Sequence, residues 1–180
     1  MDVRAFEEEA QTILDIAARY GRPTVMGFID LDNFKSVNDT LGHAEGDQVI
    51  RTVASIMSQS VRTTDLIGRM GGDEFAIFLP ETTSSGAATM FENLREKLMK
   101  AAKERVWPIG FSIGVAVFRT APSKVEEAVK LADALMYRVK KGGKNDVLFE
   151  ELDFLAETGQ QPNDKRHHKP QRAASDAPHS

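Results

Sequence analysis

The chain has 180 residues, 41% hydrophobic and 28% charged, which is typical of an ordinary globular protein with one domain. It has no cysteine, which excludes disulfides and thiolate metal sites, and its net charge of −4 does not favour binding to a nucleic-acid polymer. No apolar run approaches the ~20 residues of a membrane span, and the N-terminus does not read as a secretory signal. We therefore expect a cytoplasmic protein with no membrane segment in this chain.

The hydrophobic periodicity predicts alternating helices and strands along most of the chain. Helices are expected over residues 3–20, 33–41, 46–61, 85–106 and 122–140. Strands are expected over residues 24–31, 66–70, 75–79, 109–118 and 147–149. A two-glycine pair, Gly71-Gly72, separates the second and third strands and indicates a hairpin there.

This order of elements predicts an α+β, ferredoxin-like fold, with a central, mostly antiparallel sheet flanked by helices. We expect residues 1–150 to form the domain and residues 151–180 to form a C-terminal tail that is mostly disordered, because it is polar and rich in proline. His167 and His168 are interpreted as part of that solvated tail rather than as a metal site. His43 is then the one histidine of the folded part, which excludes a histidine-based triad there.

Three acids are expected to meet at one edge of the sheet. The stretch RMGGDEFAIFLP (69–80) places Asp73 and Glu74 directly before a strongly hydrophobic strand, and Asp30 ends the neighbouring first strand. Carboxylates are the ligands that magnesium prefers, and two such ions can serve phosphoryl transfer. From spacing alone, a turn that keeps its charges in water is as good an explanation.

The segment after the first strand has the features of an anion site. Asp32 is a natural N-cap for the following helix. The backbone N–H groups of Asn33, Phe34 and Lys35 would then point toward an anion, with the lysine charge beside them.

Asn38 and Asp47 lie on either side of a glycine-containing turn. Guanine offers a donor edge that a carboxylate can accept and acceptors that an amide can contact. From the residue types and their spacing alone, the prediction that Asn38 and Asp47 bind guanine is only weakly supported.

Taken together, these motifs resemble the GGDEF family, the diguanylate cyclases that condense two GTP into cyclic di-GMP and two pyrophosphates. The match covers residues 4–150. Its motifs are Asp-x-Asp-x-Phe-Lys-x-x-Asn-Asp (30–39), Gly-His-x-x-Gly-Asp (42–47), Gly-Gly-Asp-Glu-Phe (71–75) and Tyr-x-x-Lys-x-x-Gly-Lys-Asn (137–145). The resemblance implies the palm fold of nucleotidyl cyclases.

The resemblance also implies catalytic roles. Asp30 and Asp73 would bind Mg²⁺, or Mn²⁺ in its place, with help from the Leu31 carbonyl. Asp73 would activate the 3′-hydroxyl, and Glu74 would assist it or complete the metal shell. Lys35 would stabilise charge on the phosphates. Because each domain holds one GTP, two copies would have to face each other in a transient or ligand-linked homodimer.

Further positions are implied to contact GTP: Phe34, Asn38, Asp47, Gly71, Gly72, Lys140 and Lys144. Asn38 and Asp47 would read guanine, the glycines would let backbone approach the nucleotide, and the lysines would contact the β- and γ-phosphates. The lysines are also compatible with capping the end of the helix before them. His43 matches the motif, and a structural role in its turn explains it at least as well as catalysis.

Family members with Arg-x-x-Asp before the glycine pair bind the product at an inhibitory site, which implies this role for Arg62 and Asp65, with Arg69 as a further lining residue. An arginine can clamp a phosphate or a guanine edge, and an aspartate can accept from guanine. The alternative is a cation at a helix end followed by a loop acid.

The chain enters just after the Asp-x-Leu-Thr-Gly-Leu-x-Asn-Arg segment with which the family usually begins, so we expect weak pairing and low activity without a dimerising module. One rival reading is a non-catalytic cyclic di-GMP receptor, although the Gly71-to-Phe75 motif is intact. Another is a cyclase that makes a different cyclic dinucleotide, against which Asp47 counts.

Overall fold

The structure is a computed structural model that describes residues 1–154. Its helices are α1 (Val3–Tyr20), α2 (Phe34–Leu41), α3 (His43–Ser60), α4 (Ser84–Glu104) and α5 (Val125–Lys141). Its strands are β1 (Thr24–Asp32), β2 (Leu66–Arg69), β3 (Glu74–Pro80), β4 (Gly110–Thr120) and β5 (Val147–Asp153). The element order is the one predicted, and β5 continues to Asp153, four residues beyond the expected strand end.

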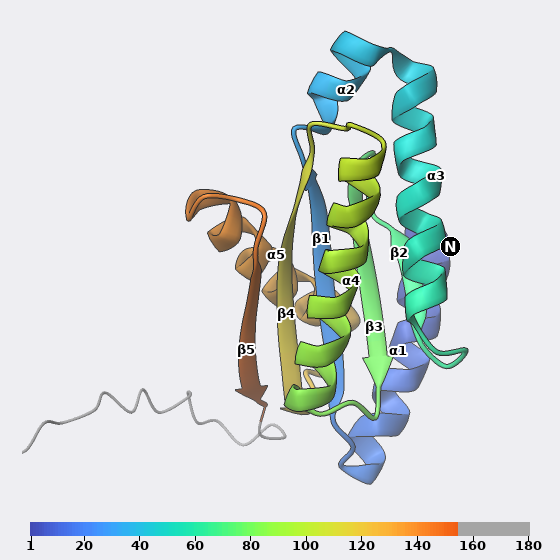
Figure 1. The fold of residues 1–180 in the computed structure, drawn as a ribbon. Coiled ribbons are helices and arrows are strands. Elements are labelled where there is room, and N and C mark those ends of the chain that lie inside the picture. Colours follow the sequence, from blue (N-terminus) through green and yellow to red (C-terminus); the bar gives the residue numbers. More distant parts are fainter. Residues whose placement is uncertain (155–180) are drawn as a thin grey trace, which may run out of the picture.

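The strands form one sheet in the order β2-β3-β1-β4-β5 (Figure 1). All neighbouring pairs are antiparallel except β4 and β5, which are parallel. The expected α+β fold with a mostly antiparallel sheet is therefore confirmed. β1 lies in the middle, and all nine of its residues are buried because helices cover both of its faces.

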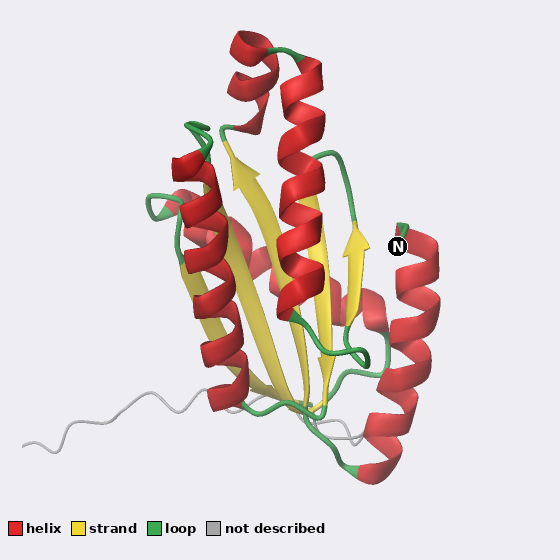
Figure 2. Ribbon diagram, turned by 45° about the vertical axis from the view of Figure 1, so that its right-hand side comes forward, coloured by secondary structure: helices red, strands yellow, loops and turns green. Residues whose placement is uncertain are grey.

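The two faces of the sheet carry separate hydrophobic cores. Helices α3 and α4 cover one face, and α1 and α5 cover the other (Figure 2). Alternate residues of β1 therefore enter different cores: Val25 and Ile29 pack under α3 and α4, whereas Met26 and Phe28 pack under α1 and α5. This double coverage explains why the central strands read as nearly continuous apolar runs.

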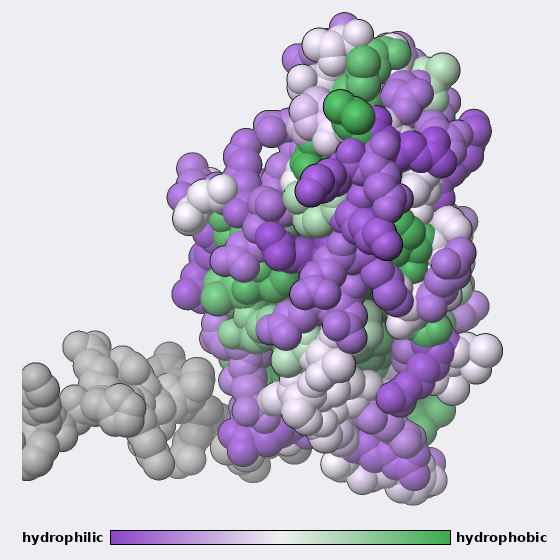
Figure 3. All heavy atoms as spheres, viewed as in Figure 1, coloured by the Kyte–Doolittle hydropathy of each residue, from purple (hydrophilic) through white to green (hydrophobic). Residues whose placement is uncertain are grey.

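The outer surface of the α3–α4 face is mostly hydrophilic, with hydrophobic spheres near the α2–α3 end and at mid-height on the left of the view (Figure 3). Among residues 1–154, no helix combines the length and the apolarity that crossing a bilayer requires. The expectation of a C-terminal tail falls largely on residues 155–180, which lie outside the described part of the chain, as do His167 and His168.

One local expectation is wrong. Asp32 does not cap α2: it is the buried last residue of β1, and the cap position is Asn33, which adopts a left-handed φ of 63° and makes no side-chain cap bond. The hairpin between β2 and β3 is confirmed, but neither Gly71 nor Gly72 has a positive φ. The reason for glycine there is therefore not a left-handed turn.

Candidate functional site

The three predicted acids come together at the end of β1. Asp30 lies opposite Glu74 in the β1–β3 pair. The backbone N–H of Leu31 donates to the Asp73 carbonyl at 3.1 Å, which holds the turn before β3 against β1. Asp30 is buried, with 9% of its surface exposed, whereas Asp73 and Glu74 are half-buried. The sheet register thus places acids from two strands around one point.

Lys140 of α5 supplies positive charge to this point. Its ammonium lies 3.0 Å from Asp30 Oδ1 and 3.4 Å from Asp32 Oδ1. Burial raises the pKa of Asp30; Lys140 opposes this rise, and the negative charges of Asp73 and Asp32 add to it. Burial works against the charged form of Lys140, but its two carboxylate partners raise the pKa of Lys140 overall. The geometry of the two groups is that of an ion pair, with the Lys140 ammonium against the Asp30 carboxylate.

The turn before β3 brings a carboxylate against a glycine. A Cβ added to Gly71 would lie 2.8 Å from Glu74 Oε2, whereas one added to Gly72 would meet no atom within 4 Å. Gly71 therefore makes room for the Glu74 carboxylate, and Gly72 leaves open space beside the acids. Burial, followed by the charges of Asp30 and Asp73, raises the pKa of Glu74.

Asp32 is a site residue that the sequence reasoning missed. It is 2% exposed, and its carboxylate accepts hydrogen bonds from the Ser112 hydroxyl at 2.7 Å and from the Asn145 backbone N–H at 2.9 Å. The Asn145 side chain in turn accepts from the Phe111 N–H at 3.2 Å. Asp32 thereby fastens the turn after α5 to the central strands. The Asp-x-Asp spacing was the available signal, because it puts Asp30 and Asp32 on the same side of one strand.

The acids fit a hard divalent cation in their chemistry. Asp30 Oδ1 is buried and accepts no well-directed hydrogen bond, so a neighbouring positive charge compensates it. Within residues 1–154, no three acidic or histidine side chains come close enough to enclose a metal by themselves. Magnesium commonly binds through one or two carboxylates and completes its shell with water and substrate phosphates, so an incomplete protein shell is the arrangement it uses.

The predicted guanine-reading residues lie on α2 and the start of α3. A Cβ added to Gly46 would fall 1.8 Å from Asn38 Oδ1, so the Asn38 amide packs directly on this glycine. Asp47 is exposed one residue further along α3. Lys35 and half-buried Phe34 begin α2, where no side chain caps the helix start and an anion can accept from the backbone N–H groups.

The remaining candidates are placed as follows. Lys144 is exposed in the turn after α5 with a left-handed φ of 65°, and its N–H donates to the Val139 carbonyl. Backbone N–H groups of this turn therefore donate to the last carbonyl groups of α5. The Lys140 ammonium contacts the acids and does not cap the helix. His43 is an exposed first residue of α3.

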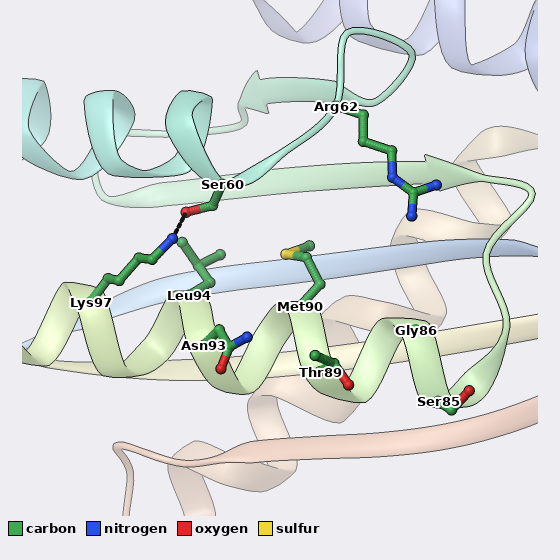
Figure 4. A pocket seen from close by; sticks show the side chains of 9 residues that line it. All are labelled: Ser60, Arg62, Ser85, Gly86, Thr89, Met90, Asn93, Leu94 and Lys97. Carbon is green, nitrogen blue, oxygen red and sulfur yellow. Dashed lines mark hydrogen bonds between the residues drawn. The ribbon is translucent and has the colours of Figure 1, made fainter.

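Arg62 extends over a pocket of about 490 Å³ between the end of α3 and α4 (Figure 4). Ser60 lies on the α3 side of the pocket. The other wall is formed by α4, which contributes polar side chains that include Asn93 and Lys97. The Lys97 Nζ lies 3.5 Å from the Ser60 Oγ. Asp65 holds the loop by accepting from the Arg62 backbone N–H at 2.8 Å, and burial raises the pKa of Asp65.

Arg69 is not among the residues that line this pocket. Its guanidinium donates to the carbonyls of Gly71 at 3.1 Å and Gly72 at 2.7 Å, so it braces the turn that carries Asp73. The structure therefore separates Arg69 from Arg62, with which the sequence reasoning had grouped it, and brings Asn93 and Lys97 to Arg62 instead.

Comparison with known proteins places this arrangement in a family. The profile described as "Diguanylate cyclase, GGDEF domain" matches residues 2–146. The chain is 36% identical over 141 residues to the probable diguanylate cyclase DgcT of Escherichia coli K12, which covers 76% of this chain and 31% of that protein. It is also 36% identical over 135 residues to the E. coli K12 diguanylate cyclase DosC, covering 73% and 29%. The chain thus spans about a third of the length of these relatives.

Solved structures agree. The GGDEF domain of DgcB from Caulobacter crescentus, in complex with c-di-GMP, superimposes with a TM-score of 0.73 at 30% identity, covering 83% of this chain and 90% of that one. The GGDEF domain of PA1120 from Pseudomonas aeruginosa has a TM-score of 0.76 at 29% identity, covering 84% and 97%. On its sequence, its fold and its motif residues, the chain belongs to the GGDEF domain family of diguanylate cyclases.

Proposed function

We propose that this chain is a diguanylate cyclase that condenses two GTP into cyclic di-GMP and two pyrophosphates between two copies of the domain. The observation that carries the proposal is that Asp30, Asp73 and Glu74 lie together at the C-terminal end of β1, next to the uncapped start of α2. Acids for a cation and N–H groups for phosphates lie side by side, as transfer between nucleotides requires.

In this proposal the nucleotide lies across the end of β1. Asn38 and Asp47 hydrogen-bond the guanine edge, and the backbone N–H groups at Phe34 and Lys35 bind phosphate oxygens. Lys140 and Lys144 approach the same end of the sheet from α5 and the turn after it, and neutralise the terminal phosphates. This role for the two lysines is supported by the position of the turn after α5, which the hydrogen bond from the Asn145 N–H to Asp32 holds beside the acids.

Asp30, Asp73 and the Leu31 carbonyl would hold the divalent cation, with Glu74 beside them. When bound, Mg²⁺ supplies Lewis-acid stabilisation of charge on the phosphate oxygens. The 3′-oxygen of GTP in one domain forms a bond to the α-phosphorus of GTP in the other, and the bond to the bridging oxygen breaks, releasing pyrophosphate. Asp73 accepts the proton of the 3′-hydroxyl, and Lys35 stabilises the phosphate charge.

The test replaces Asp73 by asparagine, which keeps the shape and removes the charge. We expect Asp73→Asn to fold like the wild type and to form cyclic di-GMP on the order of 10³-fold more slowly. Product is measured by chromatographic separation of the nucleotides after incubation with GTP and Mg²⁺. Asp153→Asn, at an exposed position at the far end of β5, is the matched control. Wild-type turnover in Asp73→Asn contradicts the assignment.

The pocket under Arg62 is the proposed site of product inhibition. It combines a guanidinium and an ammonium with hydroxyl and amide groups, which suits two phosphates and a base. We expect Arg62→Ala to retain its initial rate and to require a higher cyclic di-GMP concentration for half-inhibition, about tenfold for the loss of one charged contact. Arg119→Ala, an exposed arginine of β4, is the control. Unchanged inhibition in Arg62→Ala argues against this site.

A further inference from the structure

We propose that Trp107 and Glu45 are positioning residues for the substrate base, because the hydrogen bond between them fixes the start of α3 to the body of the domain. The inference rests on the proposed function in one respect, the assignment of Asn38 and Asp47 to guanine. Glu45 fills one of the unspecified positions of the 42–47 motif, and Trp107 lies outside all four motifs.

Trp107 is held in place by the way α4 ends. The N–H of Val106 donates to the Lys103 carbonyl at 3.2 Å, and the N–H of Trp107 donates to the Ala102 carbonyl at 2.9 Å. This is the paired bonding of a Schellman motif, with Val106 at the left-handed position, φ 57°. A branched residue is strained there, and Val106 is 82% exposed, so its own packing does not explain the conformation. The motif directs the next residue, Trp107, inward, where it is 5% exposed.

The indole N–H of Trp107 donates to Glu45 Oε1 at 2.7 Å, across 62 residues of sequence. An indole has one donor and no acceptor, and a buried indole requires a partner for that donor. Glu45 provides a carboxylate from the first turn of α3, which makes the bond a charge-assisted one. Two fixed elements, the end of α4 and the start of α3, are therefore joined by one short bond.

The joined turn carries the proposed base readers. Glu45 immediately precedes Gly46, whose backbone packs on the Asn38 amide, and Asp47 follows. Figure 1 shows α2 and the first turns of α3 projecting beyond the ends of the strands. There α2 packs chiefly on α3, so the position of both helices depends on how the start of α3 is held. Releasing the bond should displace Asn38 and Asp47 together while leaving Asp30 and Asp73 on the sheet.

The consequence is a change in base recognition without a change in chemistry. We expect Glu45→Ala and Trp107→Phe to bind guanine nucleotide about five- to tenfold more weakly than the wild type. This factor corresponds to part of the contribution of one hydrogen bond to a charged group. Glu45→Gln keeps a carbonyl acceptor for the indole and should stay within about twofold of the wild type. The turnover number at saturating GTP should change little in all three.

The experiment is isothermal titration of each variant with 3′-deoxy-GTP, which lacks the attacking hydroxyl, and with 3′-deoxy-ATP. Arg105→Ala is the matched control, because Arg105 lies over the same indole ring at 5.6 Å without taking part in the bond. Trp107 is the one tryptophan of the chain, so its fluorescence reports directly on the contact. We expect Glu45→Ala to change the emission and to lose affinity for the guanine nucleotide alone.

The possible outcomes separate the two proposals. If wild type binds 3′-deoxy-GTP and Glu45→Ala binds it equally well, the positioning role is overturned and the proposed function stands. An equal loss of affinity for both nucleotides, or a loss in Glu45→Gln as large as in Glu45→Ala, also overturns it, since a general loosening or a charge effect then explains the data. If wild type does not bind 3′-deoxy-GTP, the proposed function fails and the inference fails with it.

Discussion

The buried carboxylate of Asp32 offers a demanding test of how the fold builds its site. Replacing it by asparagine keeps the volume and removes the charge. The Ser112 hydroxyl at 2.7 Å and the Asn145 N–H at 2.9 Å both donate to Asp32, and the Lys140 ammonium lies 3.4 Å away. An asparagine offers one accepting oxygen and turns an NH₂ group toward the other donor.

The magnitude follows from these contacts. Hydrogen bonds to a charged acceptor contribute about 1.5–3 kcal/mol each, and removing one partner of a buried charged group costs about 3–5 kcal/mol. Because asparagine retains one acceptor, we expect Asp32→Asn to lose about 2–4 kcal/mol of unfolding free energy. A loss of this size is a large part of the stability of a small domain.

The assay is urea-induced unfolding at neutral pH, with amide hydrogen exchange at Asn145 as a local readout. Asp153→Asn serves as the control, because that side chain is exposed. We expect the Asn145 amide to exchange faster in Asp32→Asn, since it loses its acceptor. An Asp32→Asn variant within 0.5 kcal/mol of wild type, with unchanged exchange at Asn145, would refute the view that Asp32 fastens the turn.

Three further predictions concern the scaffold. Gly114→Ala should lose about 3 kcal/mol of unfolding free energy, because its Cβ would lie 2.2 Å from backbone atoms of α5, whereas Gly72→Ala, with no atom within 4 Å, should be nearly neutral in the same urea titration. Val106→Gly should gain about 0.5–1 kcal/mol in thermal unfolding by relieving a left-handed valine; a loss of stability would show that the valine packs usefully. Asp65→Asn should gain unfolding free energy relative to wild type as the pH rises above about 4, the ordinary pKa of aspartate: burial raises the pKa of Asp65 in the folded state, so the wild type loses stability as this carboxyl becomes charged, whereas asparagine does not titrate. Equal unfolding free energies for both proteins at every pH would contradict this.

The order of elements was predictable because each one carries a clear hydrophobic period. The meeting of Asp30 and Glu74 was predictable too, since the order of strands puts β1 beside β3 and strand ends meet at sheet edges. The roles of Asn38 and Asp47 came from the family resemblance and stay predictions.

What the sequence did not show depends on tertiary contacts. The Asp32 carboxylate looked like a helix cap because aspartate commonly fills that position, and only the burial of β1 on both faces turns it toward Ser112 and Asn145. The left-handed backbone at Lys144 and Asn145 shapes that turn; asparagine adopts this conformation more readily than most residues, but lysine gives no such signal in the sequence. Arg62 lies in the loop before β2 and Arg69 is the last residue of that strand, so the separate surroundings of the two arginines follow from the path of the chain through β2.

The most direct test of the account is to incubate the chain with GTP and Mg²⁺ over a wide range of protein concentrations and to quantify cyclic di-GMP by chromatography. We expect cyclic di-GMP as the product, with a rate that rises more steeply than linearly with protein concentration while the pairing of two domains limits it. Absence of cyclic di-GMP at every concentration, with GTP recovered intact, would contradict the proposal that this chain is a diguanylate cyclase.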